Sequence, residues 1–541
     1  MDFRDIQLHI FNLMTSDTAS LADYLACNRD LKNLTEQPPS YFRNLRVAFL
    51  SNFTLQGLPE VFEVQAIFHN LRTQTYLSPY NQYPQDILNP DSALNQFKPD
   101  LVYFLMDATD IDRAQITILL NSLLNRVRAK IIVPQSFLAP GVNSFSNPNL
   151  IGFDWDGFIN KIGRDEFWNT KYRELGDLRL SPAAFASLAN AIMGYAVSAV
   201  GVTRKCLVTD LDNTLWQGIV GEDDLEKIVP NAGFQNLLLE LYSRGVILAV
   251  NSRNNETDAL AVFGDHPDMR LHKNHLAAWR INWNDKVTNM KNLATELNLG
   301  LESFVFIDDD PFQRSLVKES LPEVAVLAPG GLAAYQGFTK LALTEEDALR
   351  GQMYAQERSR KELEITFDNL DDFLRQLQLE ICVRPVSASM LSRVSQLTQK
   401  TNQFNLTTRR YSEAEIQNFI SSGWKIWAAQ ACDRFGDYGI IGVAMAEPQP
   451  GSIWRMDNFL LSCRSLGRGL ETAFLSYVLD EVGNEGALGI AGEFIPTSKN
   501  KPCETFYRDH KFKEVTKQSG STFYEYDFSQ PCPKPGFVRF L

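Results

Sequence analysis

The chain has 541 residues, which is too many for one hydrophobic core and indicates about three domains. Its formal net charge of -13 argues against a protein that mainly grips nucleic acid, because phosphate contacts need clustered Lys and Arg. No apolar run is long enough to cross a bilayer, and the first five residues, MDFRD, lack the features of a signal peptide, so we expect a cytoplasmic location.

The cysteines indicate free thiols in a reducing compartment. Their number is odd, and no two of them have the spacing of a metal-binding pair. The seven cysteines are Cys27, Cys206, Cys382, Cys432, Cys463, Cys503 and Cys532.

The first part of the chain alternates between helix and strand patterns. Residues 1–38 have a helical pattern, and apolar runs at 45–50, 101–106 and 129–134 predict buried strands, with a helix over 116–127. Such alternation predicts a parallel sheet, so residues 41–180 should form a flavodoxin-like layer, followed by an apolar helix over 181–200.

Two carboxylates follow the next apolar run. Residues 206–209 predict a strand, and residues 210–214 read Asp-Leu-Asp-Asn-Thr. Asp210 and Asp212 can face one site only if the chain turns at Leu211, because alternate strand residues otherwise point to opposite faces. One carboxylate could attack phosphorus and form an aspartyl-phosphate while the other moves a proton; a plain polar exit from the strand is the alternative.

Three further motifs supply the remaining parts of a phosphotransfer site. The apolar run 248–252 ends in Ser252, which could donate a hydrogen bond to a phosphoryl oxygen. Lys286 opens a helical stretch and could neutralise phosphoryl charge. The run 304–307 leads into Asp308, Asp309 and Asp310, acids suited to hold a hard cation, for which magnesium is expected.

These motifs resemble those of the haloacid dehalogenase superfamily of phosphatases, which has a Rossmann-like fold. The resemblance implies that Asp210 is the nucleophile and Asp212 the general acid/base. It also implies a magnesium site formed by Asp210, the backbone carbonyl of Asp212, and Asp308 or Asp309. The strings 205–223 and 306–311 resemble the narrower group of FkbH-like proteins, in which Asn is expected in place of Asp310.

The FkbH-like resemblance also implies that the first sheet domain is similar to SGNH hydrolases. A working hydrolase of that kind would have a Gly-Asp-Ser turn after its first strand, whereas this chain has Leu50-Ser51-Asn52. Ser51 would need a nearby His, and the one His in that region is His69. We therefore expect a docking or scaffold role for this domain.

The last part of the chain contains a glycine turn between a strand and a helix. The apolar residues 460–461 are followed by Arg464, Gly467, Arg468 and Gly469 and then by a helix from residue 470 to about residue 481. Such a turn can direct backbone N–H groups at a pyrophosphate, although a plain tight loop would look the same. The pattern resembles GNAT acyltransferases, which implies binding of coenzyme A or of a carrier protein's phosphopantetheine.

A thiol and several polar residues complete the candidate site of this last domain. Cys463 could carry an acyl group as a thioester, with its pKa lowered by the helix end, or could simply be buried; Cys206 is expected in the core. The candidate substrate or carrier contacts are Thr214, which follows the two carboxylates Asp210 and Asp212, and, in the last domain, Asp437, Arg464, Gly467, Arg468, Gly469, Glu493, Thr497, Lys499 and Asn500. The polar loop around Thr497 has an equally simple structural interpretation.

The predicted domains are residues 1–40, 41–200, 201–343, a helical linker over 344–375, and 376–541. The FkbH-like resemblance implies that phosphoglycerate from 1,3-bisphosphoglycerate is bound to an enzyme thiol, dephosphorylated, and passed as glycerate to an acyl carrier protein for polyketide-type biosynthesis. A small-molecule phosphatase and a noncatalytic carrier-protein scaffold are the alternatives. Because carrier proteins are commonly acidic, we expect a basic docking patch made by Arg409, Arg410, Arg464 and Arg468.

Overall fold

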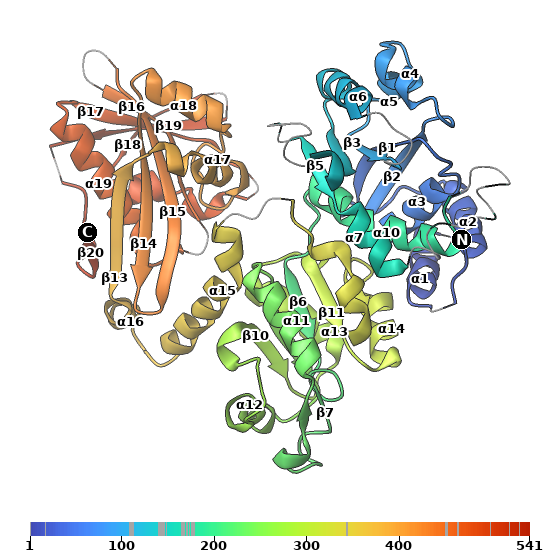
Figure 1. The fold of residues 1–541 in the computed structure, drawn as a ribbon. Coiled ribbons are helices and arrows are strands. Elements are labelled where there is room, and N and C mark those ends of the chain that lie inside the picture. The colour runs from blue at the N-terminus through green and yellow to red at the C-terminus, as the bar shows by residue number, and fades with distance from the viewer. Residues whose placement is uncertain are drawn as a thin grey trace. The chain divides into compact units, whose positions relative to one another are not determined.

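The chain divides into two units, Met1–Ala355 and Gln356–Leu541 (Figure 1). The computed structural model describes residues 2–16, 18–107, 113–138, 147, 149–163, 168, 171, 174, 179–341, 345–449, 453–462, 465–497, 499–518, 520–529 and 531–541. Among these residues, no helix combines the length and the apolar character needed to cross a membrane.

The first sheet consists of five parallel strands in the order β2-β1-β3-β4-β5. This is the order of flavodoxin-like folds, as the sequence pattern predicts. The sequence prediction missed β2 and β5, whose residues are less apolar than those of the other three strands. The strands are β1 Arg43–Ser51, β2 Leu71–Leu77, β3 Leu101–Leu105, β4 Lys130–Pro134 and β5 Leu150–Phe153.

Helices cover both faces of this sheet because successive strand residues point to opposite sides. Phe49 and Tyr103 face one group of helices, whereas Leu50 and Phe104 face the other. The first group is α1 Phe3–Met14, α2 Leu21–Lys32, α3 Leu58–Phe68, α7 Trp155–Ile162 and α10 Pro182–Ala199. The second group is α4 Tyr83–Leu88, α5 Ala93–Phe97 and α6 Arg113–Arg126.

The second sheet also has five parallel strands, in the order β10-β9-β6-β11-β12. Counted along this part of the chain, the order is 3-2-1-4-5, as in Rossmann-like sheets, and it reverses between β6 and β11. Ligands of such sheets bind outside the carboxyl ends of the strands at the point of reversal. The strands are β6 Cys206–Thr209, β9 Ile247–Ser252, β10 Leu276–Ile281, β11 Phe304–Ile307 and β12 Ala325–Leu327.

Four helices and one small hairpin accompany the second sheet. The hairpin strands β7 Trp216–Gln217 and β8 Val229–Pro230 follow β6 and pair with each other. The helices are α11 Ala232–Ser243, α12 Glu256–Asp265, α13 Lys286–Leu297 and α14 Pro311–Ser320. Buried residues of both sheets, among them Phe49 and Phe306, belong to one continuous hydrophobic cluster, so the first unit contains two sheets around a shared core.

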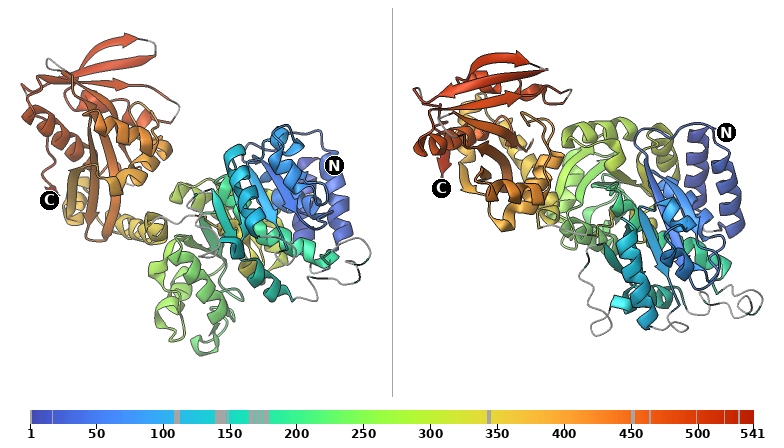
Figure 2. Two further views of the ribbon diagram at one scale, coloured as in Figure 1. Left: turned by 45° about the horizontal axis from the view of Figure 1, so that its top comes forward. Right: turned by 90° about the horizontal axis from the view of Figure 1, so that it is seen from above.

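The second unit is built on a mixed sheet of eight strands (Figure 2). Its order is β18-β19-β17-β16-β15-β14-β13-β20, and only the pairs β16/β17 and β13/β20 are parallel. The strands are β13 Leu379–Pro385, β14 Lys425–Asp433, β15 Gly436–Glu447, β16 Ile453–Leu461, β17 Gly489–Phe494, β18 Lys513–Gln518, β19 Ser521–Asp527 and β20 Val538–Phe540.

Two groups of apolar residues cover the two faces of this sheet. Phe474 of α19 packs on one face, whereas Leu397 of α17 and Ile416 of α18 pack on the other. The helices are α15 Glu345–Glu364, α16 Leu370–Leu377, α17 Leu391–Lys400, α18 Glu413–Ser421, α19 Leu470–Asn484 and α20 Phe506–Asp509. Helix α15 crosses the boundary between the two units at residue 355.

We expect a core truncation in one unit to destabilise that unit alone. Phe306 in the first unit and Phe474 in the second are both fully buried, so replacing either with Ala should cost about 3–5 kcal/mol. In differential scanning calorimetry, Phe306→Ala and Phe474→Ala should lower the temperatures of different transitions. A single transition shifted by both variants would contradict the division into two units.

Candidate active site

The predicted phosphotransfer residues gather at the carboxyl ends of neighbouring strands in the second sheet. Asp210 follows β6, Ser252 ends β9, Asp308 follows β11, and Lys286 begins α13. Strand β6 ends at Thr209, and the amides of residues 214 and 215 then donate hydrogen bonds to the carbonyl oxygen of residue 211. The turn that the sequence required is therefore present.

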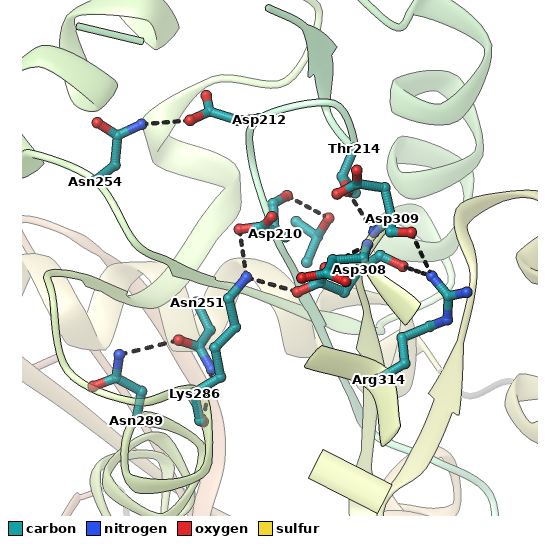
Figure 3. Close-up of polar contacts among 12 residues, drawn as sticks. Asp210, Asp212, Thr214, Asn251, Asn254, Lys286, Asn289, Asp308, Asp309 and Arg314 are labelled. Carbon is teal, nitrogen blue, oxygen red and sulfur yellow. Dashed lines mark hydrogen bonds and ion pairs between the residues drawn. The ribbon is translucent and has the colours of Figure 1, made fainter. Parts of the chain in front are cut away.

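Lys286 lies between two buried carboxylates (Figure 3). Its Nζ is 2.8 Å from Oδ1 of Asp210 and 2.6 Å from Oδ2 of Asp308. The lysine is only 3% exposed, so its charge acts in a site from which most water is excluded. It compensates the repulsion between the two carboxylates and could do the same for a phosphoryl group.

Three residues hold Lys286 in place through its backbone and its helix. Asp285 caps the start of α13, and its side chain accepts a hydrogen bond from the amide of Thr288 at 2.8 Å. Asn251 donates to the carbonyl oxygen of Lys286 at 2.9 Å and accepts from the side chain of Asn289 at 3.1 Å. The backbone from which the Lys286 side chain extends is therefore held in place beside the acids.

Asp210, Asp308 and Asp309 form a cluster that fits a magnesium ion. One carboxylate oxygen from each lies within 4.8 Å of the others, and hard oxygen ligands are those that Mg²⁺ prefers. Thr214 fixes Asp309, because its hydroxyl donates to Oδ1 at 3.2 Å and accepts from the Asp309 amide at 3.1 Å. Arg314 donates to the carbonyl oxygens of both Asp308 and Asp309 at 2.7 Å.

The environments of the acids give them different proton affinities. Burial, together with the nearby Asp210, raises the pKa of Asp308 to about 6, although Lys286 opposes the rise. Burial also raises the pKa of Asp212 above its ordinary value. A carboxyl group with a raised pKa is suited to exchange a proton with a leaving oxygen.

The Asp212 side chain is held outside the cluster of three acids. One oxygen accepts hydrogen bonds from Nε1 of Trp216 at 2.9 Å and from the amide of Val220 at 3.3 Å. The other oxygen accepts from Asn254 at 2.9 Å. This separation gives Asp212 a place distinct from that of Asp210, although its role as acid/base stays a prediction.

Ser252 and Asp310 occupy different kinds of position. Ser252 is buried at the end of β9, and its proposed contact with a phosphoryl oxygen stays a prediction. Asp310 caps α14, with its side chain accepting a hydrogen bond from the amide of Phe312 at 2.8 Å. An Asn would cap the helix equally well, so the departure from the FkbH-like pattern leaves this cap intact.

Sequence reasoning missed four residues that support the site: Asn251, Asn254, Asn289 and Arg314. Asn251 and Asn254 lie close to Ser252 at the carboxyl end of β9. This position was the only sequence signal that pointed to them. Polar residues are common where strands end, so that signal would not have identified their partners.

Ser51 and His69 do not form a catalytic pair. Ser51 ends β1, and its hydroxyl accepts a hydrogen bond from the amide of Phe53 at 3.1 Å. His69 lies just before β2, which begins opposite Arg43 at the other end of β1. Burial lowers the pKa of His69 to about 3, so the ring is a neutral part of the core.

The glycine turn of the second unit has the predicted position between a strand and a helix. Gly467 and Gly469 have φ angles of 75° and 71°, in the left-handed region that favours glycine, and α19 begins directly after Gly469. The ring of Phe537 packs so closely over Gly469 that an added Cβ would lie 2.9 Å from it. Cys463 and Arg464, the other predicted residues of this turn, lie outside the described residues.

Arg468 does not belong to a basic surface patch, contrary to the sequence prediction. Its side chain is buried, forms an ion pair with Glu357 and donates to the hydroxyl of Tyr438 at 2.9 Å. Arg409 is likewise compensated, since it pairs with Asp457 at 2.9 Å and with Glu493 at 2.7 Å. The prediction failed for these two arginines because their acidic partners are distant in the sequence.

The remaining predicted contacts of the second unit lie mainly in local turns. Asn500 is fully buried and donates to the carbonyl oxygens of residues 405 and 495, so its amide is used by the fold. Thr497 accepts from the amides of residues 499 and 500, while the exposed Asp437 accepts from Gly439 at 2.7 Å. Lys499 is exposed, as is Arg410, which donates to the carbonyl oxygen of Gln399.

The predicted roles of Asp437, Thr497, Lys499, Asn500 and Arg410 toward a substrate or carrier stay predictions.

No protein-family model matches this sequence, and no curated protein matches it either. Among solved structures, the chain is similar to the N-terminal part of protein BF1531 from Bacteroides fragilis, described as containing a phosphatase domain complexed with Mg. The match has 24% identity and a TM-score of 0.51 and covers 60% of this chain and 100% of that chain. This likeness shows a shared fold.

Two acetyltransferase structures match a smaller part of the chain. A putative GNAT-family acetyltransferase from Desulfovibrio desulfuricans has 16% identity and a TM-score of 0.23, covering 27% of this chain and 98% of that chain. The ribosomal-protein-S18-alanine N-acetyltransferase from Escherichia coli has 14% identity and a TM-score of 0.23, covering 28% of this chain and 95% of that chain.

We expect Mg²⁺ binding to depend on Asp308 and not on Asp310. Asp308→Asn should weaken Mg²⁺ binding at least roughly tenfold, because ligand charge sets the affinity of such sites. Asp310→Asn is the matched control, since Asn preserves the cap of α14. Isothermal titration calorimetry with MgCl₂ measures both; equal weakening in the two variants would contradict the assignment of the three-acid cluster.

Reversing the charge of Arg468 should destabilise the second unit rather than remove a docking contact. Arg468→Glu places a second carboxylate beside Glu357 in a buried position and should cost about 3–5 kcal/mol. The same change at the exposed Arg410 should have little effect on stability. Urea denaturation compares the two variants, and equal midpoints would show that the ion pair of Arg468 contributes nothing.

Proposed function

We propose that the protein is a magnesium-dependent phosphatase and acyltransferase that forms a glyceryl thioester on an acyl carrier protein. The observation that carries the phosphatase part is the bridge of Lys286 between Asp210 and Asp308, beside the three-acid cluster. A scaffold protein would have no need for two buried carboxylates and a buried cation at the reversal point of a parallel sheet.

In the phosphatase step, Asp210 attacks the phosphorus atom of a phosphate ester. The bond between phosphorus and the ester oxygen breaks, and the leaving oxygen takes a proton from Asp212. Water then attacks the phosphorus of the aspartyl-phosphate and gives a proton to Asp212; the bond between phosphorus and the Asp210 oxygen breaks, which restores the Asp210 carboxylate and releases inorganic phosphate. Lys286 compensates negative charge in both steps, and Mg²⁺ held by Asp210, Asp308 and Asp309 would stabilise the phosphoryl oxygens.

The acyl part of the proposal rests on the FkbH-like resemblance and on Cys463. The thiolate of Cys463 attacks the acyl carbon of 1,3-bisphosphoglycerate, the bond from that carbon to the phosphate oxygen breaks, and inorganic phosphate leaves. After the remaining phosphate ester is removed, the thiol of a carrier's phosphopantetheine attacks the thioester and frees Cys463. A covalent intermediate of this kind keeps the acyl group beside its acceptor.

A small-molecule phosphatase is the second candidate function. The residues that support phosphate removal all lie in the first unit, so this step requires no residue of the second. In that case the thiol would be dispensable, and the second unit would have another role.

Intact-mass spectrometry of the protein with Mg²⁺ and 1,3-bisphosphoglycerate separates the two functions. We expect a glyceryl adduct on the wild type, a phosphoglyceryl adduct on Asp210→Asn, and no adduct on Cys463→Ala. Cys382→Ala, which alters a half-buried cysteine of β13, should keep the glyceryl adduct as the matched control. Adding a carrier protein that bears phosphopantetheine should remove the adduct from the wild type.

Two outcomes would contradict the proposal in different ways. Phosphate release without an adduct on any variant would favour the small-molecule phosphatase. A glyceryl adduct on Asp210→Asn would show that Asp210 is not the nucleophile that removes the phosphate.

A further inference from the structure

The first sheet has a cavity at the amino ends of its strands, opposite to the edge where parallel sheets usually bind ligands. Its volume is about 660 Å³, and it lies where the chain enters β3 and β4. The lining residues are Arg46, Pro90, Asn95, Lys98, Pro99, Asp100, Arg126, Val127 and Arg128.

The charge of this cavity is strongly positive in a chain of net charge -13. Four of its lining residues are cations, namely Arg46, Lys98, Arg126 and Arg128, whereas Asp100 is the only acid. Asp100 is already engaged, because it accepts from the amide of Arg46 at 2.9 Å and pairs with the guanidinium of Arg46 at 3.3 Å.

The other three cations have no partner within the part of the chain that the structure describes. Lys98, Arg126 and Arg128 are exposed and make no ion pair or side-chain hydrogen bond with a described residue. Lys98 follows α5 and Arg126 ends α6, and cations are favourable at such helix ends. The helix ends explain why a cation is favourable at position 98 and at position 126. They do not explain why three cations line the same cavity.

We propose that this cavity, defined by Arg46, Lys98, Arg126 and Arg128, docks a protein with clustered surface carboxylates. The inference rests on the proposed function, in which that partner is the acyl carrier protein. Ser51 and His69 lie at opposite ends of β1 and form no catalytic pair. The proposed docking site gives the domain of the first sheet a role in binding instead.

A protein surface fits these cations better than a small anion does. The three free cations are exposed, and single exposed ion pairs contribute only about 0–1 kcal/mol each, so a lone small anion would be held weakly. Several carboxylates on one rigid surface would engage them together and would be steered by the local field. Two of the four arginines predicted for docking in the second unit, Arg409 and Arg468, are instead paired internally.

The test measures binding of a fluorescently labelled acyl carrier protein that bears phosphopantetheine. Reversing three charges together, with Lys98→Glu, Arg126→Glu and Arg128→Glu, should weaken binding at least roughly tenfold and remove most of its salt dependence. The control reverses three exposed cations elsewhere, with Arg375→Glu, Lys513→Glu and Arg539→Glu, and changes the net charge equally. Hydrolysis of p-nitrophenyl phosphate should be unchanged in both triple variants, and circular dichroism and thermal unfolding check that both units of each variant are folded.

The outcomes separate this inference from the proposed function. No binding to the wild type, or equal weakening by both triple variants, would overturn the docking site. Binding of inorganic phosphate that disappears in the cavity variant while carrier binding persists would also overturn it, in favour of a small-anion site. Carrier binding that depends on the cavity, without any glyceryl transfer, would uphold the docking site and reject the proposed function.

Discussion

The ion bridge of Lys286 is the interaction on which the candidate site depends. Asp210 and Asp308 are 8% and 1% exposed, and two carboxylates so far removed from water would repel each other without a cation between them. The supports of Lys286, from the cap by Asp285 to the contacts of Asn251 and Asn289, therefore belong to the site as much as the acids do. The same cation can compensate charge that a phosphoryl group brings.

The polar residues of the two units have different kinds of partners. In the first unit, Lys286 and the aspartates are directed at one another around a space that can hold a metal and a phosphate. In the second unit, Arg468 and Asn500 are satisfied by residues of the same unit and hold loops in place. The first arrangement fits phosphate chemistry directly, whereas acyl transfer in the second depends on Cys463.

The sequence predicted the parts of the fold and the site that leave local signals. Apolar runs in the sequence predicted β6, β9 and β11. In the Rossmann-like strand order β6 and β11 are neighbours, so the acids that follow these two strands lie side by side. Contacts between residues distant in the sequence left no such signal. Neither the pairing of Arg468 with Glu357, 111 residues away, nor the bond from Asn254 to Asp212 follows from local pattern. Strand β2, with its alternation of polar residues at the sheet edge, was missed for the lack of an apolar run.

Borohydride trapping at Asp210 tests the central claim most directly. During turnover of p-nitrophenyl phosphate, borohydride would reduce an aspartyl-phosphate to the alcohol homoserine, which peptide mass spectrometry can locate. We expect homoserine at position 210 in the wild type and no reduction in Asp210→Asn, because the carboxylate that faces Lys286 should carry the phosphoryl group. Phosphate release with an unmodified Asp210, or homoserine at another acid of the cluster, would contradict the account.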